Sequence, residues 1–215
     1  MPPFESIETR WFFEGDSSLH SELRSWFESC APFRRAADVR APEWTGRAGG
    51  EPDVYLLMPG CTDMGVKWRE GMLQIKGRVA DLGTRNFGAR HRGRVQRWIK
   101  WTYAEVPAAY RALFDVNGSL QTAAVHKTRA LRMISLDSAR PEEVAPDSTL
   151  ERGVGFEMTD LELHGERYCS VAFEAFPGDE ESEAGFDTVV ERVLGELEIP
   201  LGVGISLSYP DWLYR

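Results

Sequence analysis

Lysine is scarce in this chain. Its 215 residues include four lysines, Lys67, Lys76, Lys100 and Lys127, whereas the other 21 basic residues are arginines. All four lie in short segments in which apolar and polar residues alternate, the pattern of a half-buried β-strand. Because lysine is rarely buried without a partner, a chain that otherwise uses arginine and keeps lysine for its predicted strands indicates specific roles for these side chains. The first interpretation is a basic cavity.

Cysteine, histidine and long apolar runs are also scarce. The three cysteines have no CxxC spacing, which argues against a disulfide framework or a cysteine zinc site. The four histidines are isolated and form no HExxH pattern, so we expect no histidine metal centre. No stretch approaches the length of a membrane span, and the amino terminus lacks a charged segment followed by a long apolar run. We therefore expect a cytoplasmic protein with no membrane partner.

The charge is unevenly distributed. A formal net charge of -9 and a pI near 5.1 argue against general nucleic-acid binding, because phosphate backbones attract positive fields. Locally, however, basic residues dominate positions 67–97, and an acidic stretch occupies positions 179–187. A local anion site is thus compatible with an acidic protein. With 42% hydrophobic residues and no evident linker, the chain 1–215 is predicted to form one domain.

The pattern of the chain predicts an α+β fold. Helices are expected near residues 19–27, over 104–114 and after a polar run at 177–185, while 31–52 and a Gly- and Arg-rich segment at 80–93 read as connections. Seven or eight strands joined as hairpins, with two or three flanking helices, favour an eight-stranded antiparallel β-barrel, whose interior can hold a small ligand. The predicted strands cover residues 5–13, 53–58, 65–69, 72–79, 95–103, 120–135, 155–163 and 168–176.

The basic residues fall on single faces of these strands. A period of two places Lys67 with Arg69, and Lys76 with Arg78, on one face of each strand. For any one strand taken alone, a solvent-facing position on a half-buried sheet is the favoured interpretation. If several such faces point inward, an anionic ligand, acidic partners or water must satisfy them. Lys100 shares its face with Trp98 and Thr102 and would line either the barrel interior or the outer surface.

These residues resemble the CYTH domains, also called triphosphate tunnel metalloenzymes, whose eight-stranded antiparallel barrels bind triphosphate in a charged tunnel. The most specific similarity is the segment GVKWREGMLQIKGR at 65–78, which looks like the family's basic hairpin. The opening SIETR at 6–10 is similar to the family's first-strand pattern of two glutamates and a basic residue at alternate positions, with Ser6 replacing the first glutamate. Near the end, Ala172 replaces the first of two alternate glutamates, and Glu174 is the second.

The resemblance implies a divalent-metal-dependent hydrolase of inorganic or organic triphosphate. Mg²⁺ or Mn²⁺ would be held directly by Glu8 and Glu174, which would be the catalytic residues, while Glu157 would be a third metal ligand or would orient a water. A ring of basic side chains would offset the phosphate charge so that a nucleophile can approach. The phosphate contacts would come from Arg10, Lys67, Arg69, Lys76, Arg78, Lys100, Lys127 and Arg129.

Two other functions stay open at this point. With Ser6 and Ala172 in place of glutamates, the barrel would bind a polyphosphate, nucleotide or other anionic metabolite without hydrolysis. Alternatively, it would be a carrier or partner-binding module in which internal salt bridges between the lysines and the glutamates explain the mixed charges. The sequence fixes neither the organic group of a triphosphate nor the oligomeric state.

Overall fold

A computed structural model describes residues 3–15, 18–46, 50–115, 120–202 and 205–214. Eight strands form a closed antiparallel barrel, which confirms the predicted fold class. In ring order these are β10 (Gly153–Leu163), β11 (Glu166–Phe176), β1 (Phe4–Glu14), β7 (His91–Tyr103), β6 (Met72–Phe87), β5 (Met64–Arg69), β4 (Asp53–Leu56) and β8 (Thr122–Ser135), and β8 closes the ring by pairing with β10. Four short strands extend the sheet: β2 (Arg34–Arg35), β3 (Trp44–Thr45), β9 (Glu142–Val144) and β12 (Ile205–Ser206).

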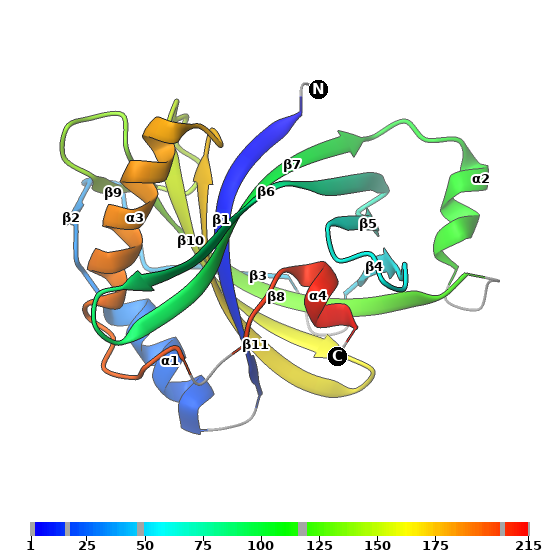
Figure 1. The fold of residues 1–215 in the computed structure, drawn as a ribbon, viewed down its shortest axis with the longest axis horizontal. Coiled ribbons are helices and arrows are strands. Elements are labelled where there is room, and N and C mark those ends of the chain that lie inside the picture. Colours follow the sequence, from blue (N-terminus) through cyan, green and yellow to red (C-terminus); the bar gives the residue numbers. More distant parts are fainter. Residues whose placement is uncertain (1–2, 16–17, 47–49, 116–119, 203–204, 215) are drawn as a thin grey trace.

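Helices flank the barrel on both sides (Figure 1). The described residues contain α1 (Ser18–Ser29), α2 (Ala108–Arg111) with a 3-10 turn at Ala112–Phe114, α3 (Glu180–Leu194) and α4 (Tyr209–Leu213), where the sequence predicted two or three. Figure 1 shows α1 and α3 on one side of the barrel and α2 on the other. Within the described segments, none of the helices has the length and apolar character that crossing a bilayer requires.

The main hydrophobic core lies between the outer face of the barrel and the helices α1 and α3. Alternate residues of β1, namely Ile7, Trp11 and Phe13, are at most 6% exposed and point into this core. The helical spacing of Leu23 and Phe27 buries one face of α1 against the same surface. Each fully buried large side chain stabilises the fold by about 1.5–3 kcal/mol. Consequently the opposite face of β1 points to the barrel interior.

A second, smaller core fills one end of the barrel interior. It joins Phe12 of β1, Tyr55 of β4 and Leu161 of β10 to Trp212 of α4. The rings of Phe12 and Trp212 stack with centroids 4.8 Å apart and an interplanar angle of 2°. Inward-facing residues occupy every second position along a strand. On β1 and β10, the inward positions that follow this apolar cluster are polar. The apolar end therefore borders a charged interior.

The hairpin of β5 and β6 agrees with its prediction. Glu70 and Gly71 have φ angles of 50° and 79°, the left-handed backbone that a two-residue type I′ turn requires. This turn fixes the register in which Lys67 faces Gln74 and Gly65 faces Lys76. Both lysines therefore lie on the same face of the hairpin.

The segment 80–93 is not the predicted connection. Strand β6 continues to Phe87 and β7 begins at His91, so the residues form a long second hairpin. Register shifts between Arg78 and Ala80 and between Asp81 and Thr84 interrupt its alternation, and bulges of this kind conceal a strand from a period-two pattern.

Three further boundaries differ from the predictions. Helix α3 begins inside the polar run 177–185, because the Asp179 side chain accepts a hydrogen bond from the Ser182 backbone N–H and caps the helix. The helix predicted over 104–114 is shorter, and β8 (Thr122–Ser135) begins two residues later than the strand predicted over 120–135. The acidic first turn of α3 then contacts the bulged hairpin, where the guanidinium of Arg85 binds Glu183 and Asp187.

His91 provides an acid-sensitive contact at the start of β7. It is buried, and its Nδ1 accepts a hydrogen bond of 3.3 Å from the Leu201 backbone N–H. Burial lowers the pKa of His91, so near pH 6 the unfolded chain binds more protons than the folded one and stability falls as the pH drops below about 6.5. We expect the unfolding temperature to decrease from about pH 7 to about pH 5. The decrease should be smaller in His91→Asn, and an identical pH slope in both proteins would contradict this assignment.

Candidate functional site

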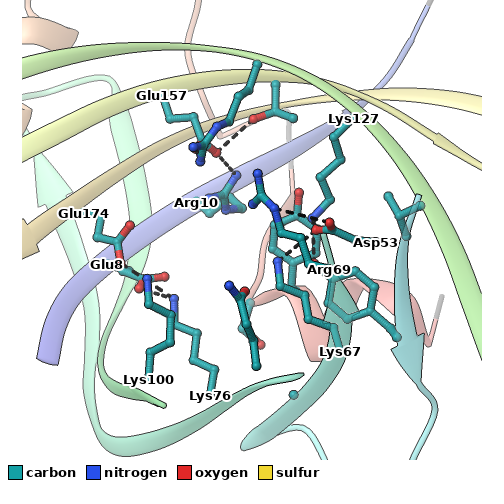
Figure 2. Close-up of a pocket in the computed structure, with 18 of the residues that line it drawn as sticks. Glu8, Arg10, Asp53, Lys67, Arg69, Lys76, Lys100, Lys127, Glu157 and Glu174 are labelled. Carbon is teal, nitrogen blue, oxygen red and sulfur yellow. Dashed lines mark hydrogen bonds and ion pairs between the residues drawn. The ribbon is translucent and has the colours of Figure 1, made fainter. Parts of the chain in front are cut away.

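The inner face of the barrel lines a cavity of about 770 Å³ (Figure 2). Eight basic and six acidic side chains contribute to its wall, within a chain whose net charge is -9. Lys100, which the sequence placed either inside the barrel or on its outer surface, lines this cavity. Ten of the eleven predicted site residues are among the lining residues: Glu8, Arg10, Lys67, Arg69, Lys76, Lys100, Lys127, Arg129, Glu157 and Glu174.

Arg78 is the predicted site residue that does not line the cavity. It follows Lys76 on the same face of β6, but the register shift begins directly after it. Its guanidinium carbon lies 6.0 Å from the centroid of the Trp98 ring, and Trp98, its register partner on β7, is itself a lining residue. The bulge thus ends the alternation that placed Arg78 among the tunnel residues.

Three basic side chains surround Asp53, a residue that the sequence analysis did not include in the site. Lys67 Nζ donates a hydrogen bond of 2.8 Å to Asp53 Oδ2, and Lys127 Nζ lies 2.8 Å from the same oxygen. Arg69 Nε lies 3.6 Å from Oδ1. A signal existed: Asp53 and Tyr55 share one face of the strand predicted over 53–58, by the same period of two that grouped the lysines.

The charges around Asp53 do not balance. Burial disfavours the ionised carboxylate, but Lys127 and Lys67 outweigh this effect and hold the pKa of Asp53 well below its usual range. Burial and the charge of Lys127 lower the pKa of Lys67 to about 7. Burial likewise lowers the pKa of Lys127 to about 8, although Asp53 acts in the opposite direction. One carboxylate shared by three cations leaves positive charge that a further anion would compensate.

Glu157 is the centre of a second cluster, formed with two arginines. Arg10 Nη1 donates to Glu157 Oε1 at 3.0 Å, and Arg129 Nη1 donates to Oε2 at 3.3 Å. Thr159 Oγ1 also donates to Oε1, at 2.9 Å. Burial opposes ionisation of Glu157, but Arg10 and Arg129 prevail and lower its pKa to about 2. Glu157 therefore remains a carboxylate that orients the two arginines.

Glu8 and Glu174 form the third cluster, at directly opposed positions of β1 and β11. Lys76 Nζ donates to Glu8 and lies 4.0 Å from Glu174, and Ser6 Oγ donates to Glu8 Oε1 at 2.6 Å. Burial opposes ionisation of Glu8, but the charge of Lys76 dominates and lowers its pKa to about 2. Burial and the charge of Glu8 raise the pKa of Glu174. The Ser6 hydroxyl thus stabilises the ionised Glu8.

The three glutamates predicted as metal ligands do not come together as one site. Glu157 is bound by two arginines, whereas Glu8 and Glu174 are adjacent to each other. In the part of the chain that the structure describes, no group of three or more His, Cys, Asp or Glu side chains is arranged to hold a metal ion. Mg²⁺ is commonly held by one or two carboxylates, waters and substrate phosphates, and the Glu8–Glu174 pair fits that minimal arrangement.

Helix α4 covers the Asp53 cluster, which no local sequence pattern indicated. The Tyr209 ring stacks on Tyr55 with centroids 5.7 Å apart and an interplanar angle of 7°. Lys127 Nζ lies 4.1 Å from the Tyr209 centroid and donates to Tyr55 Oη at 2.6 Å. Arg10 approaches the same Tyr209 ring at 4.9 Å. These aromatic contacts hold the two cations in place and reduce their exposure to water.

Models of known protein families, curated proteins and solved structures were each compared with the chain, and none matches it. The resemblance to the CYTH domains therefore stays an expectation from the sequence.

Proposed function

We propose that this protein binds a small molecule carrying a chain of phosphates in the barrel cavity and hydrolyses it with the aid of a divalent cation. The observation that carries the proposal is the grouping of Lys67, Arg69 and Lys127 around the single carboxylate of Asp53. Charge-assisted hydrogen bonds from such cations to phosphate oxygens are among the stronger polar contacts in proteins. A cavity of about 770 Å³ has the size of a small-molecule site.

Each of the three clusters would contact a different part of the phosphate chain. The Asp53 cluster would bind one end, and the arginines held by Glu157 would contact the middle. At the other end, Glu8 and Glu174 would hold Mg²⁺ or Mn²⁺, which supplies Lewis-acid stabilisation of the developing negative charge when it is bound. Lys76 and Lys100, which line the same region, would neutralise the phosphate oxygens there.

Two observations favour binding without hydrolysis as the second candidate. Lys76 already pairs with Glu8, so a cation would have to displace its ammonium group. Ser6 supplies a hydroxyl to Glu8 where a further carboxylate would strengthen cation binding. A barrel of this kind would retain a polyphosphate or nucleotide through its basic residues and release it unchanged.

Phosphate release from tripolyphosphate, ATP and thiamine triphosphate, measured with Mg²⁺ or Mn²⁺, tests the proposal. We expect metal-dependent release that Glu8→Gln reduces on the order of 100-fold, because the substitution removes the ionised member of the carboxylate pair. Glu14→Gln, an exposed position on the same strand, is the matched control and should retain activity. Calorimetric binding without release would select the second candidate. If none of the three compounds binds, both candidates are wrong.

A further inference from the structure

Lys67 and Lys127 hold their amino groups against the same atom. Each Nζ lies 2.8 Å from Oδ2 of Asp53, so the two nitrogens are close neighbours within the cavity wall. Their side chains are only 17% and 15% exposed, and both nitrogens lie over the Tyr55 ring, 5.5 and 4.9 Å from its centroid. Two ammonium groups in such proximity repel each other, and little water is available to screen them.

Lys76, which also lines the cavity, is placed differently. Lys76 contacts Glu8 and approaches Glu174, so its positive charge is matched by carboxylates, and although burial acts against it, these carboxylates raise its pKa. Lys67 has the reverse balance, with a pKa lowered to about 7 by burial and by Lys127. An uncharged lysine carries the lone pair that a nucleophile needs, and a neighbouring cation in a desolvated pocket is a known means of producing one.

We propose that Lys67 is a nucleophilic amine that forms an imine with an aldehyde bearing a phosphate group. The Lys67 nitrogen bonds to the carbonyl carbon as the C=O π bond breaks, and the carbonyl oxygen leaves as water with the two amine protons, which leaves a C=N bond. Arg69 and Lys127, which share Asp53 with Lys67, would bind the phosphate. The inference goes beyond the proposed function, because it requires neither a phosphate chain nor hydrolysis.

The groups that face Lys67 determine how the reaction depends on pH. Asp53 and Tyr55 come from β4, Arg69 from β5, Lys127 from β8 and Tyr209 from α4. Burial raises the pKa values of Tyr55 and Tyr209 and keeps both phenols protonated at neutral pH, while Asp53 remains ionised. The uncharged fraction of Lys67 should therefore increase through about pH 7, and its labelling should increase in parallel.

Reductive labelling of the full-length protein tests the inference directly. Pyridoxal 5′-phosphate serves as the phosphorylated aldehyde, borohydride reduces the imine to a stable amine, and peptide mass spectrometry locates the label among four lysines. At neutral pH we expect at least about tenfold more label on Lys67 than on Lys76, since each unit of pKa changes the uncharged fraction about tenfold. Lys67→Arg should lose this label. Glu14→Gln, at an exposed position of β1 that does not line the cavity, should retain it.

Equal labelling of the lysines, or labelling concentrated on Lys76, Lys100 or Lys127, would overturn the assignment to Lys67. Thermal unfolding of Lys67→Arg and Glu14→Gln checks that each variant is folded. Tripolyphosphate separates this inference from the proposed function. If Lys67 is labelled and tripolyphosphate neither protects it nor binds, the amine is reactive and the proposed function is wrong. If tripolyphosphate binds and Lys67 stays unlabelled, the proposed function stands and the inference fails.

Discussion

Replacing Arg132 with methionine should destabilise the protein by about 3 kcal/mol or more, because truncating one partner of a buried ion pair typically costs about 3–5 kcal/mol. Arg132 is 4% exposed and joins β8 to β9 and to the end of α1. Its guanidinium donates to both oxygens of Glu143 at 2.8 and 2.7 Å, to the carbonyls of Phe27 and Cys30 at 2.8 Å each, and to Cys30 Sγ at 2.9 Å. The substitution leaves Glu143, itself 3% exposed, with Arg35 as its remaining ion-pair partner.

A neighbouring ion pair provides the matched control. Arg34 Nε on β2 lies 3.2 Å from Oε1 of Glu142 on β9, but the Arg34 side chain is 86% exposed. Exposed pairs contribute about 0–1 kcal/mol, so Arg34→Met should change the free energy of unfolding by less than about 1 kcal/mol. Urea unfolding of the two variants and the parent protein measures the difference. Similar losses in both variants would mean that burial does not determine the strength of these pairs.

The barrel was predictable because most of its strands alternate regularly. In β1, a period of two separated Ile7, Trp11 and Phe13 from Glu8 and Arg10, and the structure places the two sets in the core and in the cavity. The same rule failed at 80–93, where two register shifts interrupt the alternation of β6. It also failed at the start of α3, whose acidic residues resemble a polar loop until Arg85 and Arg97 are brought beside them from positions about a hundred residues away.

Regular alternation also predicted most of the candidate site, but the prediction lacked Asp53 and Tyr209. Alternation identified the inward basic residues of β5, β6 and β8 without information on which strands are neighbours. Recognising Asp53 as their partner requires knowing that β4 lies between β5 and β8, and this order arises only when the ring is assembled. Tyr209 depends on the return of the chain to the barrel at α4, a contact that no local pattern encodes.

Substituting Asp53 with asparagine should weaken the fold and strengthen anion binding at the same time. The substitution leaves Lys67, Arg69 and Lys127 in a largely buried position without their shared carboxylate, which should cost about 3–5 kcal/mol of stability in the absence of an anion. A bound phosphate would then gain hydrogen bonds to charged donors that no longer compete with Asp53, each contributing about 1.5–3 kcal/mol. The dissociation constant for tripolyphosphate should therefore decrease on the order of tenfold or more.

Thermal unfolding of Asp53→Asn with increasing tripolyphosphate, beside calorimetry, measures both effects. Glu70→Gln is the control for loss of one negative charge near the same arginine, since Glu70 is 69% exposed and its Oε1 lies 3.5 Å from Arg69 Nε. At a tripolyphosphate concentration about 100 times the dissociation constant, binding should increase the free energy of unfolding of Asp53→Asn by about 2.7 kcal/mol. Glu70→Gln should have nearly the stability and affinity of the parent protein. If Asp53→Asn is destabilised but binds tripolyphosphate no better, the three cations serve the fold through Asp53, and the anion site must be sought elsewhere in the cavity.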